Sequence, residues 1–207
     1  MARRSALPLL ALLILLVSAL PAHAAEIVEP PAPTGAPQAA SPAGPLLAPG
    51  VHASASRDLW ATVNTCDTFA SPDAMGVRAS MPGNGTSQRM YMRFSAQWYS
   101  SAAGGWLDVA GGKSPWVSAG SARYRARQAG WSFDFATPAY GHAYVLRGTV
   151  EYQWRSVRRT KGARRSGFRV ARQRTLLTTT GVRGVRGGDP KGTSKAMCAV
   201  ANLGIID

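Results

Sequence analysis

Hydrophobic and polar residues alternate along several segments between residues 58 and 202, as expected for strands with one buried face. The clearest are QRMYMRFSAQWYS (88–100), LRGTVEYQWR (146–155), GWSFDF (130–135) and MGVRASM (75–81). The side chains predicted to face the core are Met90, Met92, Phe94, Ala96, Trp98, Leu146, Val150, Tyr152, Trp154, Trp131, Phe133, Phe135, Met75, Val77, Ala79 and Met81.

Shorter segments with a weaker pattern complete the predicted set of strands. They are LWATVNTC (59–66), FRVARQRTLLTTT (168–180) and SKAMCAV (194–200). Turn sequences rich in glycine, proline and asparagine separate the strands, for example MPGNGT (81–86) and RGGDPKG (186–192). No window shows a sustained helical repeat, so the sequence predicts an all-β fold. We expect an antiparallel β-sandwich of about seven to nine strands rather than a barrel.

The chain before this domain has two further parts. Residues 1–24 have the features of a signal peptide: Arg3 and Arg4, then an apolar run of fourteen residues from Leu7 to Leu20, then AHA. The run is shorter than the roughly 20 residues of a membrane-spanning helix, although an uncleaved anchor is the alternative. Residues 25–57 are rich in proline and alanine and predict an extended, disordered leader. The expected domain is 58–202, followed by a tail at 203–207.

The chain contains two cysteines, Cys66 and Cys198, near opposite ends of the expected domain. An exported chain with an even number of cysteines is expected to pair them in an oxidising compartment. We therefore predict one disulfide and a secreted or cell-surface location. The alternative, a catalytic cysteine, would need a nearby base to form thiolate, and neither cysteine has one in the local sequence.

The sequence also resembles a known group of proteins. SPWVSAG, GWSFDF, LRGTVEYQWR and GGDPKGTSKAMCAV are similar to segments of uncharacterised exported proteins from high-GC bacteria. The cysteine near the first strand, the tryptophan on a middle strand and the cysteine in the last strand resemble an immunoglobulin-like sandwich, in general form close to fibronectin type III. The resemblance implies a fold, and fold likeness implies no activity.

One stretch is strongly basic. After Trp154, the twenty residues to Arg174 contain nine basic residues and no acid. We predict a hairpin with its tip near residues 160–162, and the candidate anion-binding residues are Arg158, Arg159, Lys161, Arg164 and Arg165. Guanidinium groups match phosphate and carboxylate geometry, so the partner we expect is an anionic cell-envelope polymer. Arg147 and Arg155 would extend the charge along the first strand, whereas the facing of Arg169, Arg172 and Arg174 is open.

The alternative is that the hairpin is only a solvated surface. The chain has a net charge of +14, which falls to +12 if Arg3 and Arg4 leave with the signal peptide. Codon bias in a high-GC genome produces many arginines without selection for binding, and net charge keeps an exported domain soluble. Sequence-specific nucleic-acid recognition is not expected, because export makes an encounter rare and no helix suited to base recognition is visible.

Other candidate chemistry is weaker. Trp106 and Trp116 lie in glycine-rich surroundings and are candidates for stacking on a sugar ring, and the alternative is that both rings close the open end of the sandwich. A secreted hydrolase of unrecognised type would need His142 beside an acid and a nucleophile. No histidine and cysteine cluster has the spacing of metal ligands, so we expect no metal, no cofactor and a protein that is not an enzyme. The oligomeric state is left open.

Overall fold

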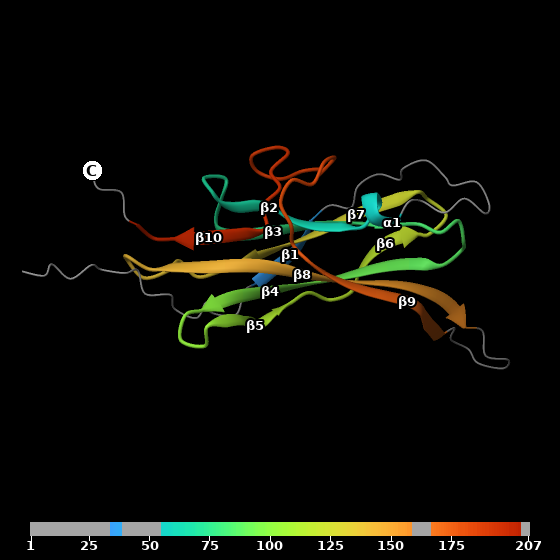
Figure 1. Ribbon diagram of the computed structural model, residues 1–207, viewed down its shortest axis with the longest axis horizontal. Helices are drawn as coiled ribbons and strands as arrows, with labels where there is room; N and C mark the ends of the chain where they lie inside the picture. The colour runs from blue at the N-terminus through green and yellow to red at the C-terminus, as the bar shows by residue number, and fades with distance from the viewer. Residues whose placement is uncertain (1–33, 39–54, 159–166, 204–207) are drawn as a thin grey trace, which may run out of the picture.

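The structure, a computed structural model, describes residues 34–38, 55–158 and 167–203 (Figure 1). Within them the regular elements are one turn of helix, α1 (Ala55–Asp58), and ten strands. The strands are β1 (Thr34–Gln38), β2 (Trp60–Thr68), β3 (Ser71–Pro82), β4 (Arg89–Ser100), β5 (Gly105–Lys113), β6 (Val117–Ser121), β7 (Ala126–Asp134), β8 (Ala143–Arg158), β9 (Gly167–Leu177) and β10 (Met197–Ala201). All pairings between these strands are antiparallel, which confirms the predicted all-β class.

The strands form two sheets. The four-stranded sheet has the order β1-β7-β3-β2, and the six-stranded sheet is built around β8 and β4. β8 is 16 residues long, and its side away from β4 pairs with β10 over its first part and with β9 over its second. On the far side of β4, β6 and β5 are arranged end to end in the same way. The six-stranded sheet is therefore four strands wide, with β9 and β10 sharing one edge.

The core lies between the two sheets and contains the predicted inward-facing residues. All sixteen residues named from the alternating pattern are buried. Two hydrogen bonds also join the layers: the Tyr152 hydroxyl donates to the carbonyl of Trp60 at 2.7 Å, and Trp154 Nε1–H donates to the carbonyl of Pro82 at 3.0 Å. Each bond satisfies the one polar atom of a large buried ring, so both aromatic side chains can lie fully in the core. Burial raises the pKa of Tyr152 well above its ordinary value.

The outer face of the four-stranded sheet is covered by the segment 178–196. This segment leaves the end of β9, crosses over β2 and returns to β10 (Figure 1). Its backbone bonds to Val63, which donates to the Lys195 carbonyl and accepts from the Lys195 amide, both at 2.9 Å. The Thr62 hydroxyl donates to the Thr179 carbonyl at 2.7 Å. β2 and β3 are consequently buried on both faces, and burial together with the charge of Arg186 lowers the pKa of Arg78 on β3.

Three strands of the structure were not predicted from the pattern. β5 and β6 lie in the glycine-rich stretch between residues 101 and 121, where φ is positive at Gly111 and Gly120 and the ladders with β4 contain register shifts. Such irregular strands lose the strict alternation that identifies a strand. β1 lies within the residues predicted as a leader, and it pairs with β7 from Thr34 to Gln38.

Candidate functional site

The second part of β8 and the whole of β9 form a ladder at the edge of the six-stranded sheet, residues 152–158 and Gly167–Leu177, called the basic arm below. β8 also pairs with β4 as far as Arg155, so only residues 156–158 extend beyond β4. β9 is exposed along almost its whole length. In Figure 1 the end of β8 and the start of β9 diverge from the layer formed by β2, β3 and β7. The exposed part of the arm at this end of the sandwich is therefore β9 together with Val157 and Arg158 of β8.

The register of the arm places three arginines of β9 on the face that points toward the sandwich interior. Arg172 lies opposite the core residue Trp154, and Arg169 lies opposite Ser156. Opposite residues in an antiparallel ladder share a face, and Arg174, two residues after Arg172, shares it too. The Arg172 guanidinium carbon lies 5.0 Å from the centroid of the Trp154 ring. Arg172 thus stands at the rim of the core, stacked on an aromatic ring with its polar edge toward solvent.

A hollow of about 610 Å³ opens on this inner face near the end of the arm. It is lined by Gln88, Ser156, Val157, Arg158, Arg169 and Ala171. The glutamine amide donates to the serine hydroxyl at 3.2 Å, so hydrogen-bonding groups stand beside the two arginines. The hollow is therefore lined by two arginines and by neutral hydrogen-bonding side chains. Side chains of these types bind oxyanions.

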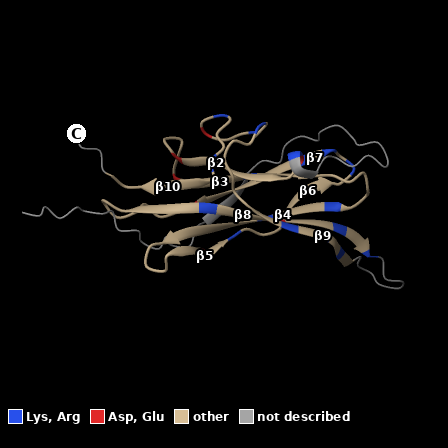
Figure 2. Cartoon of the chain, viewed as in Figure 1, with Lys and Arg blue, Asp and Glu red and all other residues tan. Residues whose placement is uncertain are grey.

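No acid neutralises these arginines within the part of the chain that the structure describes. The described arm contains no Asp or Glu, and none of Arg158, Arg169, Arg172 and Arg174 forms an ion pair with a described residue. Figure 2 shows Lys and Arg bands at this end and the Asp and Glu bands elsewhere. Residues two apart on a strand are about 7 Å apart, within the roughly 8 Å screening length at physiological salt, so the positive charges repel one another.

The remaining predicted anion-binding residues fall outside the described residues. Of the five, Arg158 ends β8 and lines the hollow, whereas Arg159, Lys161, Arg164 and Arg165 belong to 159–166. For the arginines of β9, the sequence left open which face of the sheet they lie on. The register with β8 places Arg169, Arg172 and Arg174 on the inner face. The contributions of Gln88 and Ser156 were missed, because only the spatial pairing of β4 with β8 brings them together.

On the outer face of the six-stranded sheet, which points away from the other sheet, Glu151 is paired with two basic side chains. Glu151 accepts hydrogen bonds from Arg93 at 2.9 and 3.0 Å, and Lys113 Nζ lies 3.2 Å from the same carboxylate. Burial by itself acts to raise the pKa of Glu151, but the hydrogen bonds and charges of Arg93 and Lys113 outweigh it and the pKa is lowered. This carboxylate is fully engaged by two cations.

A lowered pKa in the folded state means that ionised Glu151 stabilises the fold above the carboxyl's ordinary pKa of 4.5, and that this contribution is lost as the pH falls further. We expect Glu151→Gln to lower the free energy of unfolding at pH 7 by about 1–2 kcal/mol. Urea unfolding of both proteins between pH 7 and pH 3 should show the difference shrinking toward acid. A difference that stays constant over this range would contradict the assignment.

The two tryptophans considered for sugar stacking lie on the outer face, and both are half-buried. The guanidinium of Arg147 stacks on Trp106 at 4.3 Å, and those of Arg93 and Arg155 each lie 4.5 Å from the centroid of Trp116. To stack on either tryptophan, a sugar would have to displace an arginine or bind to a face of the indole ring that no arginine covers. The carbohydrate interpretation stays a prediction with this added requirement.

His142 lies just before β8, where its amide donates to the Ala139 carbonyl at 2.9 Å and its carbonyl accepts from the Asn202 amide at 3.1 Å. Among the described residues, no group of three or more His, Cys, Asp and Glu side chains is arranged to hold a metal ion. Within the same residues, no helix is long and apolar enough to cross a membrane.

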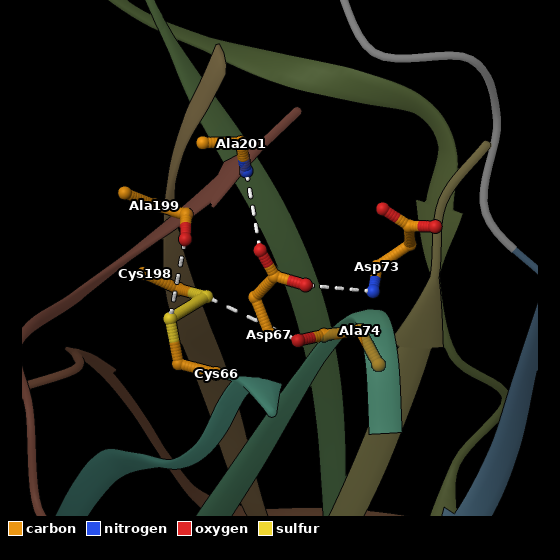
Figure 3. The surroundings of a disulfide bond; sticks show 7 residues. All are labelled: Cys66, Asp67, Asp73, Ala74, Cys198, Ala199 and Ala201. Carbon is orange, nitrogen blue, oxygen red and sulfur yellow. Dashed lines mark hydrogen bonds between the residues drawn. A yellow bond between two sulfur atoms is a disulfide. The ribbon is translucent and has the colours of Figure 1, made fainter. Parts of the chain in front are cut away.

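The predicted disulfide is present and lies at the opposite end of the sandwich from the basic arm. Cys66 on β2 and Cys198 on β10 are bonded, with 5.3 Å between their Cα atoms (Figure 3). Beside them, the Asp67 carboxylate accepts from the amides of Asp73 at 2.9 Å and Ala201 at 3.2 Å. Because β2 and β10 are edge strands of different sheets, the disulfide and this carboxylate together hold the two layers at one end.

A scan against models of protein families finds no match for this chain, and searches of curated proteins and of solved structures find none either. The resemblance to exported immunoglobulin-like proteins of high-GC bacteria therefore stays a prediction. What is established is a disulfide-linked antiparallel β-sandwich whose basic arm forms no ion pair with an acid among the described residues.

Proposed function

We propose that this protein is an exported, non-enzymatic binding domain that attaches to an anionic polymer of the cell envelope through the basic arm. Two features support an extracytoplasmic location: the signal-like residues 1–24 and the disulfide, which is compatible with an oxidising compartment. The arm supplies the binding surface, and the rest of the sandwich holds it rigidly.

The observation that carries the proposal is the set of exposed arginines on the inner face of the arm, none paired with an acid among the described residues: Arg158, Arg169, Arg172 and Arg174. A surface that served only for solubility could carry both acidic and basic residues. Opposite charges across a ladder would stabilise it, so an all-basic face costs stability that such a surface would not need to lose. An anion bound here relieves the repulsion between the arginines and receives charge-assisted hydrogen bonds.

A polymer suits this surface better than a single small anion. From Arg169 to Arg174 the strand extends by roughly 17 Å, so the arginines cannot all reach one small group. A linear chain that carries a negative charge on each repeat can contact them in succession and release its counterions as it binds. The phosphate-bearing and carboxylate-bearing polymers of cell envelopes both have this form.

The test is retention of the full chain on immobilised polyphosphate and on immobilised polygalacturonate. In the arm variant, Arg158, Arg169, Arg172 and Arg174 are changed to Ser. Exposed surface pairs contribute about 0.2–1 kcal/mol each, so we expect affinity to fall about tenfold or more. The matched control changes the exposed residues Arg183, Arg186, Lys191 and Lys195 to Ser, which removes the same charge from the segment 178–196 instead of from the arm.

We expect the control to elute close to the parent and the arm variant at clearly lower salt. Equal retention of the arm variant and the parent would remove the proposal, and equal losses in both variants would reduce it to a net-charge effect. Salt also separates it from sugar stacking, because stacking on Trp106 or Trp116 would persist at high salt and change tryptophan fluorescence with neutral glycans.

A further inference from the structure

A second group of basic residues lies on the outer face of the six-stranded sheet, on the opposite side of the ladder from the hollow. Its centre is Arg155, whose guanidinium carbon lies 4.3 Å from the centroid of the Tyr91 ring and 4.5 Å from that of Trp116. Arg155 Nε–H donates to Gln153 Oε1 at 2.8 Å. Two rings and one amide therefore fix the position of this side chain.

The contacts of Arg155 leave the outer edge of its guanidinium group available. No described carboxylate pairs with Arg155, and no described residue accepts from its Nη atoms. The nearest outward-facing acid on the same strand is Glu151, four residues and roughly 13 Å away along the strand, and it is already engaged by Arg93 and Lys113. A guanidinium held by stacking loses little conformational entropy when it forms a paired hydrogen bond.

The residue opposite Arg155 on β4 is a second arginine, Arg89, which is exposed. Like charges placed directly opposite each other in an antiparallel pair destabilise the ladder. On its other side, Arg89 lies opposite the neutral Ser121 on β6, so that neighbour brings no compensating charge. The fixed guanidinium and the like-charge pair are separate observations, and both are explained by an anion that lies between the two arginines.

We propose that Arg89 and Arg155 form a second anion-binding site, which takes one phosphate or carboxylate group between their guanidinium groups. Arg155 supplies the fixed, paired donors, and Arg89 supplies a second charge that adjusts to the ligand. The site lies on the other face of the sheet from the basic arm's inner arginines, so it does not depend on polymer binding there. If both faces bind, one domain can connect two anionic chains.

The test uses nuclear magnetic resonance of the arginine Nε–Hε groups in the full chain, titrated separately with inorganic phosphate and with acetate. Arg147 is an internal reference, because its guanidinium also stacks on a ring, that of Trp106 at 4.3 Å, and its Nε–H also donates to a glutamine, Gln97, at 2.9 Å. It differs from Arg155 in that the residue opposite it on β4 is this glutamine and not an arginine. We expect the Arg155 signal to shift and saturate at about millimolar anion, with the Arg147 signal moving several-fold less. Saturation with phosphate, acetate or both supports the site and identifies its anion.

Two variants test the geometry. Arg89→Gln, followed through the Arg155 signal, should weaken the apparent affinity about tenfold. Arg155→Lys, followed through the Arg89 Nε–Hε signal in the parent and in the variant, should weaken it at least fivefold, because lysine keeps the charge but lacks the planar fork. The arm variant with four serines should keep the Arg155 response, so failure of the arm proposal would be seen separately. An Arg155 signal that moves no more than that of Arg147 with either anion, or an unchanged affinity in Arg155→Lys, would overturn the inference.

Discussion

Removing the Cys66–Cys198 disulfide is expected to lower the free energy of unfolding by about 5 kcal/mol. The cysteines are 132 positions apart, so the bond closes a loop that contains most of the described domain. In the chain-entropy model, such a loop restricts the unfolded chain strongly and stabilises the folded state by this amount. The loss is comparable to the whole stability of a marginal domain, which is about 5–15 kcal/mol.

The measurement is urea unfolding of the parent, of the reduced parent and of a Cys66→Ala, Cys198→Ala double variant. Alanine avoids adding a polar group where Cys198 is buried. Reduced parent and double variant should agree with each other and unfold at much lower urea than the oxidised parent. A loss below about 1 kcal/mol would mean that the Asp67 hydrogen bonds and the packing of β2 against β10 hold the layers without the bond.

The second large effect is expected from Trp154→Ala, which should cost about 3–5 kcal/mol. Trp154 is among the largest fully buried side chains, and its Nε1–H bond to the Pro82 carbonyl joins the two sheets. Its removal also deprives Arg172 of the ring on which it stacks. The variant therefore tests the link between the core and the basic arm, because polymer affinity should fall although no arginine is changed.

Trp154→Phe is the matched control. Phenylalanine keeps most of the buried apolar surface but cannot donate to Pro82, so we expect a loss of about 1–2 kcal/mol. Thermal or urea unfolding measures both variants, and retention on polyphosphate measures the arm. If Trp154→Ala were to cost less than 1 kcal/mol, the ring would not lie in a closed core.

The sequence predicted the faces of the regular strands well. Met92, Phe94, Val150 and Tyr152 could be assigned because β4 and β8 each have one face on a continuous core, which imposes strict alternation. The disulfide was predicted from the signal-like residues 1–24 and an even cysteine count, and the structure confirms it. β3 is different: its residues are buried on both faces, because the segment 178–196 bonds to β2 on one side of it and to Gln128 of β7 on the other and so passes over it. That cover depends on a long-range return of the chain, which local alternation does not indicate.

The candidate site was predictable only in its charge. The run of arginines is visible in the sequence, but its division between two faces depends on the register of β9 against β8 and on the shift between Trp154 and Arg155. The stacking of Arg155 on Tyr91 and Trp116 joins three separate strands or loops, so no sequence window contains it. Pairings of this kind require the folded sheet.

The central claim is that the basic arm binds an anionic polymer through arginines that the fold leaves uncompensated. Its most direct test is the dissociation constant for soluble polyphosphate between about 50 and 200 mM salt, measured for the parent and the arm variant. By analogy with nucleic acids, each lost contact lowers the slope of log affinity against log salt by about 0.7–0.9. We predict a slope that is shallower by about 3 in the arm variant, whereas equal slopes for the two proteins would contradict the account.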